Sequence, residues 1–245
     1  MPRDAMDTEL PKPPLEIGSS FAGYKILGLI GQGGHACVFH AHDEFLNKHF
    51  ALKVLYRDGG VTPEMMRRGQ TEAQFLSSVR HPNIVEVHRA GIENGLLFIV
   101  MELLEGRSLR VVQHQAGQLA VDEVLSLAAQ IADAVAAAHD RKAIHRDLKP
   151  DNVFICRDNR AKVLDFGVAK LMDPGGWVTQ KDIVVGTMLY MSPEQVQGMP
   201  LGPASDVYSL GLILYTLLLA SHAKQSGPQC VPSASLKQPV VPGHS

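Results

Sequence analysis

The stretch AIHRDLKPDNVFI, residues 143–155, brings two kinds of metal-binding and proton-accepting side chain close together, in Asp147 and Asn152. After a short turn it is followed by AKVLDFGVAK, in which Asp165 comes after a β-like run. Two carboxylates and an amide suit Mg²⁺, which prefers oxygen ligands, together with a hydroxyl group that must lose its proton. Chance identity to both segments, in this order, is far rarer than a match to one triplet. A chemical site is therefore favoured over a solvated loop.

Length, charge and cysteine content limit what such a site can act on. The chain has 245 residues, of which 45% are hydrophobic and 20% charged, enough to bury the core of one large domain or two smaller lobes. A formal charge of −2 argues against nucleic acid as a partner, so any phosphate site must be local. The three cysteines, Cys37, Cys156 and Cys230, are odd in number and widely spaced, so they do not indicate a disulfide framework and fit a reducing cytoplasm.

The two ends of the chain differ from its middle. Residues 1–20 carry acidic residues and prolines where a signal peptide needs an apolar core, and they predict a flexible leader. The apolar run VYSLGLILYTLLLA, residues 207–220, is shorter than the about 20 residues of a membrane span and predicts a buried helix instead. Residues 221–245 contain prolines and serines without helical periodicity, which predicts a disordered tail.

Between these ends the hydrophobic period changes. The first half contains short β-like runs separated by turn residues: YKILGLI, ACVFHAH, HFALKVLY, NIVEVHRAGI and LLFIVME. One helix is predicted among them, in VTPEMMRRGQTEAQFLSSV. Later, VDEVLSLAAQIADAVAAAH has a helical period that places five apolar residues on one face: Val124, Leu127, Ala128, Ile131 and Val135. These patterns predict the α+β class, with a small β-rich lobe followed by a mainly helical lobe.

Two charges of the first lobe lie on apolar faces. Lys53 alternates with Ala51 and Leu55 in a predicted strand, and Glu72 lies one turn from Leu76 on the apolar stripe of the predicted helix. Because an unpaired buried charge is costly, we expect Lys53 and Glu72 to pair. The alternative, commoner for an isolated charge, is that both side chains extend to solvent at the edge of the lobe.

The segment IGQGGHACVF, residues 30–39, is rich in glycine. Gly31, Gly33 and Gly34 would let backbone N–H groups approach phosphate oxygens. The glycines join two predicted strands and no helix follows, which disfavours a dinucleotide-binding loop. Ala36 stands where the last glycine of a G-x-G-x-x-G pattern would be, and it should stiffen the loop modestly.

The segment CVFHAHDE, which overlaps this loop, has two interpretations, a metal site and a solvated hairpin. Cys37, His40 and His42 are all residue types that bind metals. On a strand, however, Cys37 points to one face and the two histidines to the other. A solvated hairpin is therefore favoured over a metal site.

Together these motifs resemble those of the eukaryotic-type (Hanks-type) serine/threonine protein kinases. The residues within the motifs resemble those of the bacterial branch of this family. The resemblance covers roughly residues 24–220 and implies a bilobal protein-kinase-like fold. Its small antiparallel β-rich lobe would span residues 21–104 and its mainly helical lobe residues 105–220, with ATP and Mg²⁺ in the cleft between them. By position it implies that Ile30, Gly31 and Gly33 belong to the loop over the phosphates. It also implies that Lys53 contacts the α- and β-phosphates while pairing with Glu72.

The same resemblance assigns the remaining site residues. Six residues are implied to contact adenine. Met101 would be the gatekeeper, and the backbone of Glu102 and Leu104 would form the hinge. The base would lie between the apolar side chains of Val38, Ala51 and Phe154. Asp147 would orient or deprotonate the substrate hydroxyl, and Lys149 would steady the transferred phosphoryl group. Asn152 and Asp165 would hold Mg²⁺.

Regulation is also implied by the resemblance. Arg146, next to Asp147, resembles an arginine that commonly receives a phosphorylated activation-loop residue. Thr179 lies in the region expected for the phosphorylated residue of the activation loop, and we predict that it is autophosphorylated. The alternative is that Thr179 is an exposed loop residue without a regulatory role. Thr187 resembles the threonine that helps to shape the peptide-substrate site.

The last part of the chain departs from the family pattern. SPE, residues 192–194, stands in for A-P-E, whose glutamate pairs with a later arginine in the family. No arginine follows Arg160, so Glu194 is expected to lack that partner. Asp206 is implied to anchor the catalytic-loop backbone, and the lobe is expected to lack its last helices. The uncovered helix at residues 206–219 would then offer a surface for aggregation or self-association.

Three functions follow from these observations. The first is a cytoplasmic, ATP- and Mg²⁺-dependent kinase that phosphorylates Ser or Thr in protein substrates. The second is a truncated kinase-like module that binds a nucleotide or a partner with little or no turnover. A small-molecule kinase is a weaker third, because Lys149 and the GTMLYMSPE segment point to protein substrates.

Overall fold

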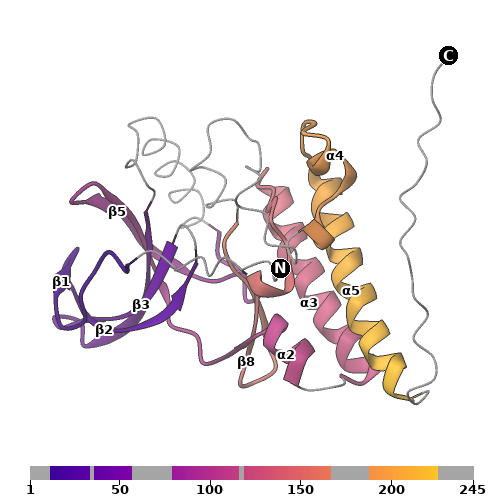
Figure 1. Ribbon diagram of the computed structural model, residues 1–245, viewed down its shortest axis with the longest axis horizontal. Helices are drawn as coiled ribbons and strands as arrows, with labels where there is room; N and C mark the ends of the chain where they lie inside the picture. The colour runs from indigo at the N-terminus through magenta and orange to yellow at the C-terminus, as the bar shows by residue number, and fades with distance from the viewer. Residues whose placement is uncertain (1–11, 34–35, 57–78, 116–118, 167–187, 226–245) are drawn as a thin grey trace, which may run out of the picture.

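The computed structural model describes residues 12–33, 36–56, 79–115, 119–166 and 188–225 of the chain. Figure 1 shows a lobe built mainly from strands beside a lobe built mainly from helices. This is the predicted α+β architecture. The helix predicted in VTPEMMRRGQTEAQFLSSV lies almost entirely outside the described residues.

The first lobe is a six-stranded antiparallel sheet in the order β1-β2-β3-β4-β6-β5. Its strands are β1 (Ser20–Phe21), β2 (Tyr24–Gln32), β3 (Ala36–Asp43), β4 (Lys48–Leu55), β5 (Val87–Glu93) and β6 (Leu96–Glu102). Each of the predicted β-like runs corresponds to one strand of this sheet. Central β4 is buried on both faces, which is why its sequence alternates less clearly than that of β3.

Both faces of this sheet bury apolar side chains. One face carries a cluster of its own that includes Phe21, Phe39 and Phe98, and the rings of Phe21 and Phe98 meet edge to face at 5.6 Å. Residues on the opposite face, including Leu55 and Ile99, belong to a larger core that continues into the second lobe. The sheet is therefore joined to the helical lobe by continuous packing.

The start of the sheet corrects one expectation. Leu15 packs against the first apolar cluster. The backbone N–H of Gly18 donates to the carbonyl oxygen of Ile26 at 2.8 Å, and that of Ile26 donates to Ser19 at 2.9 Å. The boundary predicted at residue 20 for a flexible leader is therefore too late, because an apolar side chain and backbone hydrogen bonds tie residues 15–20 to the sheet.

The second lobe adds a small sheet, of which the sequence indicated only the β-like run before Asp165. β7 (Gly106–Ser108), β8 (Val153–Cys156) and β9 (Ala161–Val163) form a three-stranded antiparallel sheet. Strands this short show no clear period. Gly106 has a φ of 154°, and a Cβ there would lie 2.1 Å from the carbonyl oxygen of Ile155, so only glycine allows β7 to pair so closely with β8.

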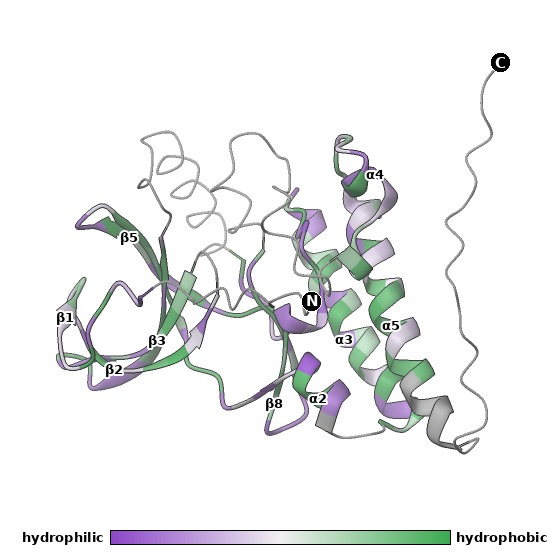
Figure 2. Cartoon of the chain, in the orientation of Figure 1, coloured by the Kyte–Doolittle hydropathy of each residue, from purple (hydrophilic) through white to green (hydrophobic). Residues whose placement is uncertain are grey.

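The described helices of the second lobe are α2 (Leu109–Gln115), α3 (Val121–Asp140), α4 (Pro193–Val196) and α5 (Pro203–Gln225), with 3₁₀ turns η1 (Pro150–Asn152) and η3 (Met188–Tyr190). Helix α3 packs against α5, while α2 contacts the small sheet and the turn η1. Figures 1 and 2 show α3 and α5 side by side, with apolar residues along both. Four of the five residues predicted on the apolar face of α3 are buried, and Ala128 is half-buried.

Helix α5 is longer than predicted. It continues through Gln225, past the boundary expected at residue 220, because the first helix-breaking residues after Leu219 are Gly227 and Pro228. Residues 226–245 of the predicted tail lie outside the described residues. None of the helices in the described part of the chain combines the length and apolar character that crossing a membrane requires.

Candidate active site

One buried carboxylate holds the loop that follows α3. Asp206, at the start of α5, is 1% exposed. Its carboxylate accepts hydrogen bonds from the backbone N–H groups of His145 at 2.7 Å and Arg146 at 2.9 Å. It also contacts Nε2 of His139 at 2.8 Å. These donors compensate the buried charge, and the loop takes the anchored path expected for Asp206.

His145 connects this loop to the segment that contains Asp165. Its Nε2 donates to the carbonyl oxygen of Leu164 at 2.7 Å, while its Nδ1 accepts the backbone N–H of Asp147 at 3.3 Å. Both contacts require a neutral imidazole. Burial lowers the pKa of His145, against the smaller opposing effect of the Asp206 charge, so the neutral form is favoured.

The backbone on both sides of His145 takes an uncommon conformation. Arg146 has a φ of 66° and Asp165 a φ of 58°, in the left-handed region that L-residues other than Asn and Asp rarely adopt. Such conformations persist where surrounding contacts over-determine them, and they cluster at functional sites. Here the contacts are those made by His145 and Asp206.

Asp147, Lys149 and Asn152 form the first predicted group, and the structure brings them together. Nδ2 of Asn152 donates to the backbone carbonyl of Asp147 at 2.8 Å and to its carboxylate at 3.0 Å. Nζ of Lys149 lies 2.9 Å from the same carboxylate oxygen, Oδ2. The carboxylate of Asp147 is therefore oriented by an amide and a cation, while Asn152 itself is only 8% exposed.

Lys53 reaches across the two lobes. Its Nζ lies 2.6 Å from Oδ1 of Asp165, and its side chain is 9% exposed. Burial, the largest single effect, would raise the pKa of Asp165, but the charge and hydrogen bond of Lys53, together with the charges of His145 and Lys149, lower that pKa, so the carboxylate is ionised. The pairing expected with Glu72 lies outside the described residues. Sequence reasoning missed the Lys53–Asp165 pair because it depends on how the lobes meet.

The oxygen atoms of this group fit Mg²⁺. Asp165 offers an ionised carboxylate, and Asn152 offers its amide oxygen because its nitrogen is engaged by Asp147. Within the described ranges, no cluster of three or more metal-binding side chains would form an all-protein cage. Mg²⁺ at nucleotide sites usually has one or two carboxylate ligands and completes its shell with phosphates and water. The donors therefore suit a metal that arrives with a nucleotide.

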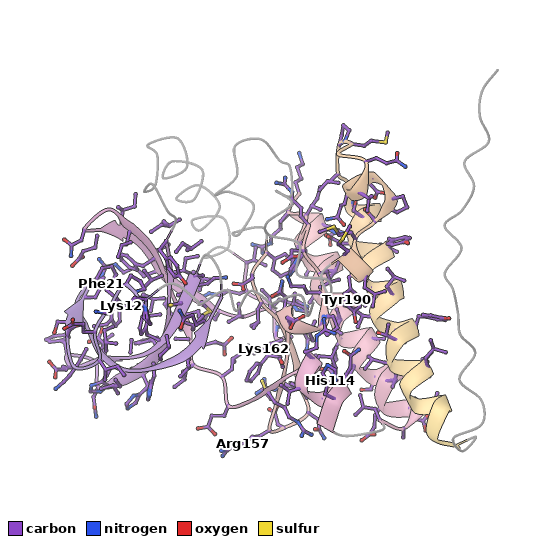
Figure 3. All side chains as sticks on the ribbon, viewed as in Figure 1. Lys12, Phe21, His114, Arg157, Lys162 and Tyr190 are labelled. Carbon is purple, nitrogen blue, oxygen red and sulfur yellow. The ribbon has the colours of Figure 1, made fainter. Side chains whose placement is uncertain are left out.

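The segment that joins the lobes lies at the end of β6. Met101 is buried and lines a small pocket that also contains Asp165. The other residues around this pocket are apolar: Ile84, Val85, Val87, Ile99 and Phe166. Glu102 follows, and its Oε1 accepts the backbone N–H of Glu86 at 2.7 Å and contacts Nζ of Lys162 at 2.6 Å. Figure 3 shows Lys162 between the two lobes.

The predicted adenine-contacting residues come from both lobes. Val38 on β3 pairs across the sheet with Lys53, so its side chain is on the same face as the lysine, and Ala51 lies on that face two residues before Lys53. Phe154 is half-buried on β8 of the second lobe, and Leu104 follows β6. Their strand positions are consistent with a site formed between the lobes.

The glycine-rich segment is described up to Gly33, with Ile30 and Gly31 in the last part of β2. The backbone N–H of Gly33 donates to the carbonyl oxygen of Ala36 at 2.8 Å. The hydroxyl of Tyr56 donates to the carbonyl oxygen of Gly33 at 2.6 Å. Tyr56, at the end of β4, therefore helps to position the turn, a role that its sequence context did not reveal.

The predicted regulatory residues are only partly described. Arg146 is exposed, and its carbonyl oxygen accepts Nε2 of Gln195 at 2.6 Å. Thr179 and Thr187 lie outside the described residues. Glu194, expected to lack its family partner, accepts the hydroxyl of Ser205 at 2.5 Å, and this hydrogen bond lowers the pKa of Glu194. In this chain, a buried serine of α5 is therefore the hydrogen-bond partner of Glu194.

Comparison with known proteins agrees with this arrangement. The family described as protein kinase domain matches residues 24–230. The chain is 40% identical over 203 residues to serine/threonine-protein kinase PrkC of Bacillus subtilis, covering 82% of this chain and 31% of PrkC. It is 35% identical over 233 residues to serine/threonine-protein kinase PknA of Mycobacterium tuberculosis, covering 92% of this chain and 54% of PknA.

A solved structure extends the agreement to the fold. The crystal structure of the Mycobacterium tuberculosis PknI kinase domain matches with a TM-score of 0.69 and 29% identity, over 84% of this chain and 78% of that one. The chain therefore belongs to the protein kinase family, and the relatives named here are bacterial serine/threonine kinases. It spans about a third of the length of PrkC and about half the length of PknA.

Proposed function

We propose that this chain is a protein serine/threonine kinase that transfers the γ-phosphoryl group of ATP to Ser or Thr hydroxyls of proteins. The observation that carries the proposal is the convergence of four groups from two lobes: the Lys53–Asp165 pair and the hydrogen-bonded Asp147–Asn152 pair. Family membership supports it, since the relatives compared above are named as kinases of this class.

Each residue has a separate part in this mechanism. Asp147, oriented by Asn152 and Lys149, orients the substrate hydroxyl and accepts its proton. Lys53 and Lys149 supply positive charge for the phosphates and for the transferred phosphoryl group. Asn152 and Asp165 would hold Mg²⁺, which neutralises charge on the phosphate oxygens when bound. ATP as donor also places the proposed reaction in the cytoplasm.

Regulation at Arg146 belongs to the same proposal. Arg146 is exposed next to Asp147, and its backbone is held by Asp206 and Gln195. Phosphorylation of Thr179 would supply an anion that the guanidinium of Arg146 could bind. Thr187 would contribute to the surface that holds the substrate peptide.

A second proposal is that the chain associates with itself through α5 and turns over slowly as an isolated module. Side chains on one side of α5 are substantially exposed although they are large and apolar: Val207, Tyr208, Tyr215 and Leu219. Burial of such a surface between two copies would stabilise a dimer. This is the observation that favours the kinase-like interaction module.

The decisive experiment measures transfer of labelled phosphate from ATP to a generic basic protein. We expect Asp147→Asn to reduce incorporation by a factor of about 10² to 10⁴, because the proton acceptor is removed while its shape is retained. The matched control is Asp151→Asn, which alters an exposed carboxylate in the same loop that is paired with Arg110 at 3.0 Å. Its activity should remain within about twofold of wild type. Equal incorporation of phosphate by wild type and Asp147→Asn would contradict the proposal that this chain is a kinase.

A further inference from the structure

Three histidines gather on one face of the first lobe, outside the residues assigned to phosphoryl transfer. His40 and His42 lie two residues apart on β3 and therefore point to the same face. His49 on β4 is the direct cross-strand partner of His42. Sequence reasoning considered His40 and His42 only with Cys37, which is fully buried on the opposite face, and it did not bring His49 into the group.

The rings of this group are in direct contact. Nε2 of His40 lies 2.9 Å from Nδ1 of His49, and the ring of His42 stacks on that of His49 with centroids 4.6 Å apart. Two ring nitrogens at this distance share one proton, so one of them presents a lone pair to the other.

We propose that His40 and His49 chelate a transition-metal dication of the kind that prefers imidazole, such as Zn²⁺ or Ni²⁺. The metal would take the place of the shared proton. Metal–nitrogen bonds of about 2.0–2.1 Å in a tetrahedral arrangement separate two nitrogens by about 3.3–3.4 Å, so the two nitrogens must move apart by about 0.4 Å and both rings must turn until their lone pairs point to a metal off the line between them. His49 is exposed, which leaves room for this movement and for water at the remaining coordination positions.

The proposed metal ligands are His40 and His49, and His42 is not a third ligand. Nε2 of His42 is turned toward Oδ1 of Asn47 at 3.1 Å. Consistent with this, no set of three metal-binding side chains converges anywhere in the part of the chain that the structure describes. His42 supports the site by stacking against His49 and limiting the rotation of that ring.

The surrounding strands hold the pair in place without adding an opposing charge. The turn between β3 and β4 is closed by Asp43, whose Oδ1 accepts the backbone N–H groups of Phe45 and Leu46 at 3.0 and 2.9 Å. Lys25, the β2 partner of His42, is paired with Glu44 at 3.6 Å. Its charge is therefore compensated next to the proposed metal.

The histidine pair lies on the same face of the sheet as Lys53. His40 is the cross-strand partner of Ala51 and lies two residues from Val38, so it is on the sheet face that carries Lys53. Two residues along a strand correspond to about 7 Å. Metal binding here is independent of phosphoryl transfer, so it can be tested whether or not the proposed kinase activity is found.

The test is calorimetric titration of the full 245-residue chain with ZnCl₂, without nucleotide, and then with NiCl₂. We expect His49→Ala to weaken binding at least tenfold, and His40→Gln to have the same effect. His49 is exposed, so its replacement leaves the fold intact. The matched control is His114→Ala, which removes a single exposed histidine at the end of α2, labelled in Figure 3.

A second measurement is thermal unfolding, because a metal that binds only the folded chain raises its melting temperature. Zinc should raise the melting temperature of wild type and of His114→Ala, and should raise that of His49→Ala less. Equal zinc affinity in wild type, His49→Ala and His40→Gln would identify adventitious binding at other residues and overturn the proposal. So would an equal loss of affinity in His114→Ala.

Discussion

At the scale of single residues, buried polar side chains determine the path of the catalytic loop. Asp206 fixes two successive amides, and His145 joins that loop to the segment ending at Asp165. The ring nitrogens of His145 have specific partners, so protonation of Nδ1 would break its contact with the backbone N–H of Asp147. The loop is therefore sensitive to pH through residues that need not touch the substrate.

His145 provides a pH prediction. Its folded pKa lies below the value of about 6.5 expected in the unfolded chain, so the unfolded chain binds more protons at low pH. The stability that this histidine contributes is complete above about pH 6.5 and is lost as the pH falls toward its folded pKa. We expect His145→Gln to flatten the fall in unfolding free energy by up to about 1.4 kcal/mol per pH unit.

Urea denaturation at pH 7 and pH 5.5 measures this slope. His114→Gln is the control, since His114 is exposed and should leave the slope unchanged. A slope in His145→Gln as steep as in wild type would show that another group is responsible.

Glu194 and Ser205 provide a second residue-scale prediction. The hydrogen bond from Ser205 is the main cause of the lowered pKa of Glu194. Ser205→Ala should therefore raise that pKa toward its ordinary value, as followed by an NMR titration of the side-chain carboxyl. Ser209→Ala is the matched control, because it deletes another buried hydroxyl of α5 that bonds to Tyr190 instead. An unchanged pKa in Ser205→Ala would contradict this assignment.

The residue types of the site could be predicted from sequence, but several of their partners could not. Asp147 and Asn152 are five residues apart, so their contact follows from local spacing. Lys53 and Asp165 meet only because the lobes pack together, and the partner expected for Lys53 was a different carboxylate. His49 joined His40 only through the register of two strands, which a single strand pattern does not specify.

At the scale of elements, β6 and β9 are linked by a charged pair between the lobes. Oε1 of Glu102 and Nζ of Lys162 are 2.6 Å apart, with 26% and 11% of their side chains exposed. The preceding segment adds backbone bonds, since Val85 donates to the carbonyl oxygen of Val163 at 3.0 Å. This link should fix the segment after β6, where the proposed adenine contacts begin.

A double-mutant cycle tests the link. Glu102→Gln, Lys162→Met and the double variant should give a coupling energy of about 1–2 kcal/mol in unfolding free energy, because the pair is mostly buried. The matched control is the exposed pair of Glu105 and Arg157, at 3.0 Å, whose coupling should be below about 0.5 kcal/mol. Equal coupling in the two pairs would show that burial does not strengthen the link.

Element boundaries show where sequence patterns carried information. The strands of the first lobe are bounded by turn residues, and the long apolar stripe of α3 marks a helix clearly. In the small sheet, β9 was predicted as the β-like run before Asp165, but β7 and β8 were missed because they span only three and four residues. The end of α5 was misplaced because a change to polar residues does not itself stop a helix.

At the scale of the whole molecule, the described part of the second lobe ends with one long helix, α5. Ile213 and Leu217 of α5 are buried, while Tyr215 and Leu219 are 45% and 44% exposed on the same helix. Figure 1 shows α3 along one side of α5. The exposed residues therefore belong to a surface that the described helices do not cover.

We expect this surface to drive self-association. Replacing Tyr215 and Leu219 together with lysine should lower the sedimentation coefficient of the chain at high concentration, because paired charges oppose burial of the surface. Leu125→Lys is the control, since Leu125 is 51% exposed on α3. If both variants sediment like wild type, association does not use this face of α5.

The contact of Asp206 with the catalytic loop also has a consequence for synthesis on the ribosome. Its carboxylate binds amides that precede it by 61 and 60 residues. At elongation rates of about 5–20 residues per second, this residue is added roughly 3–12 seconds after the loop that it anchors. During that interval the nascent chain contains every group of the Asp147 loop but cannot hold the loop in its final form. The order of translation therefore delays assembly of the site until α5 has begun to emerge.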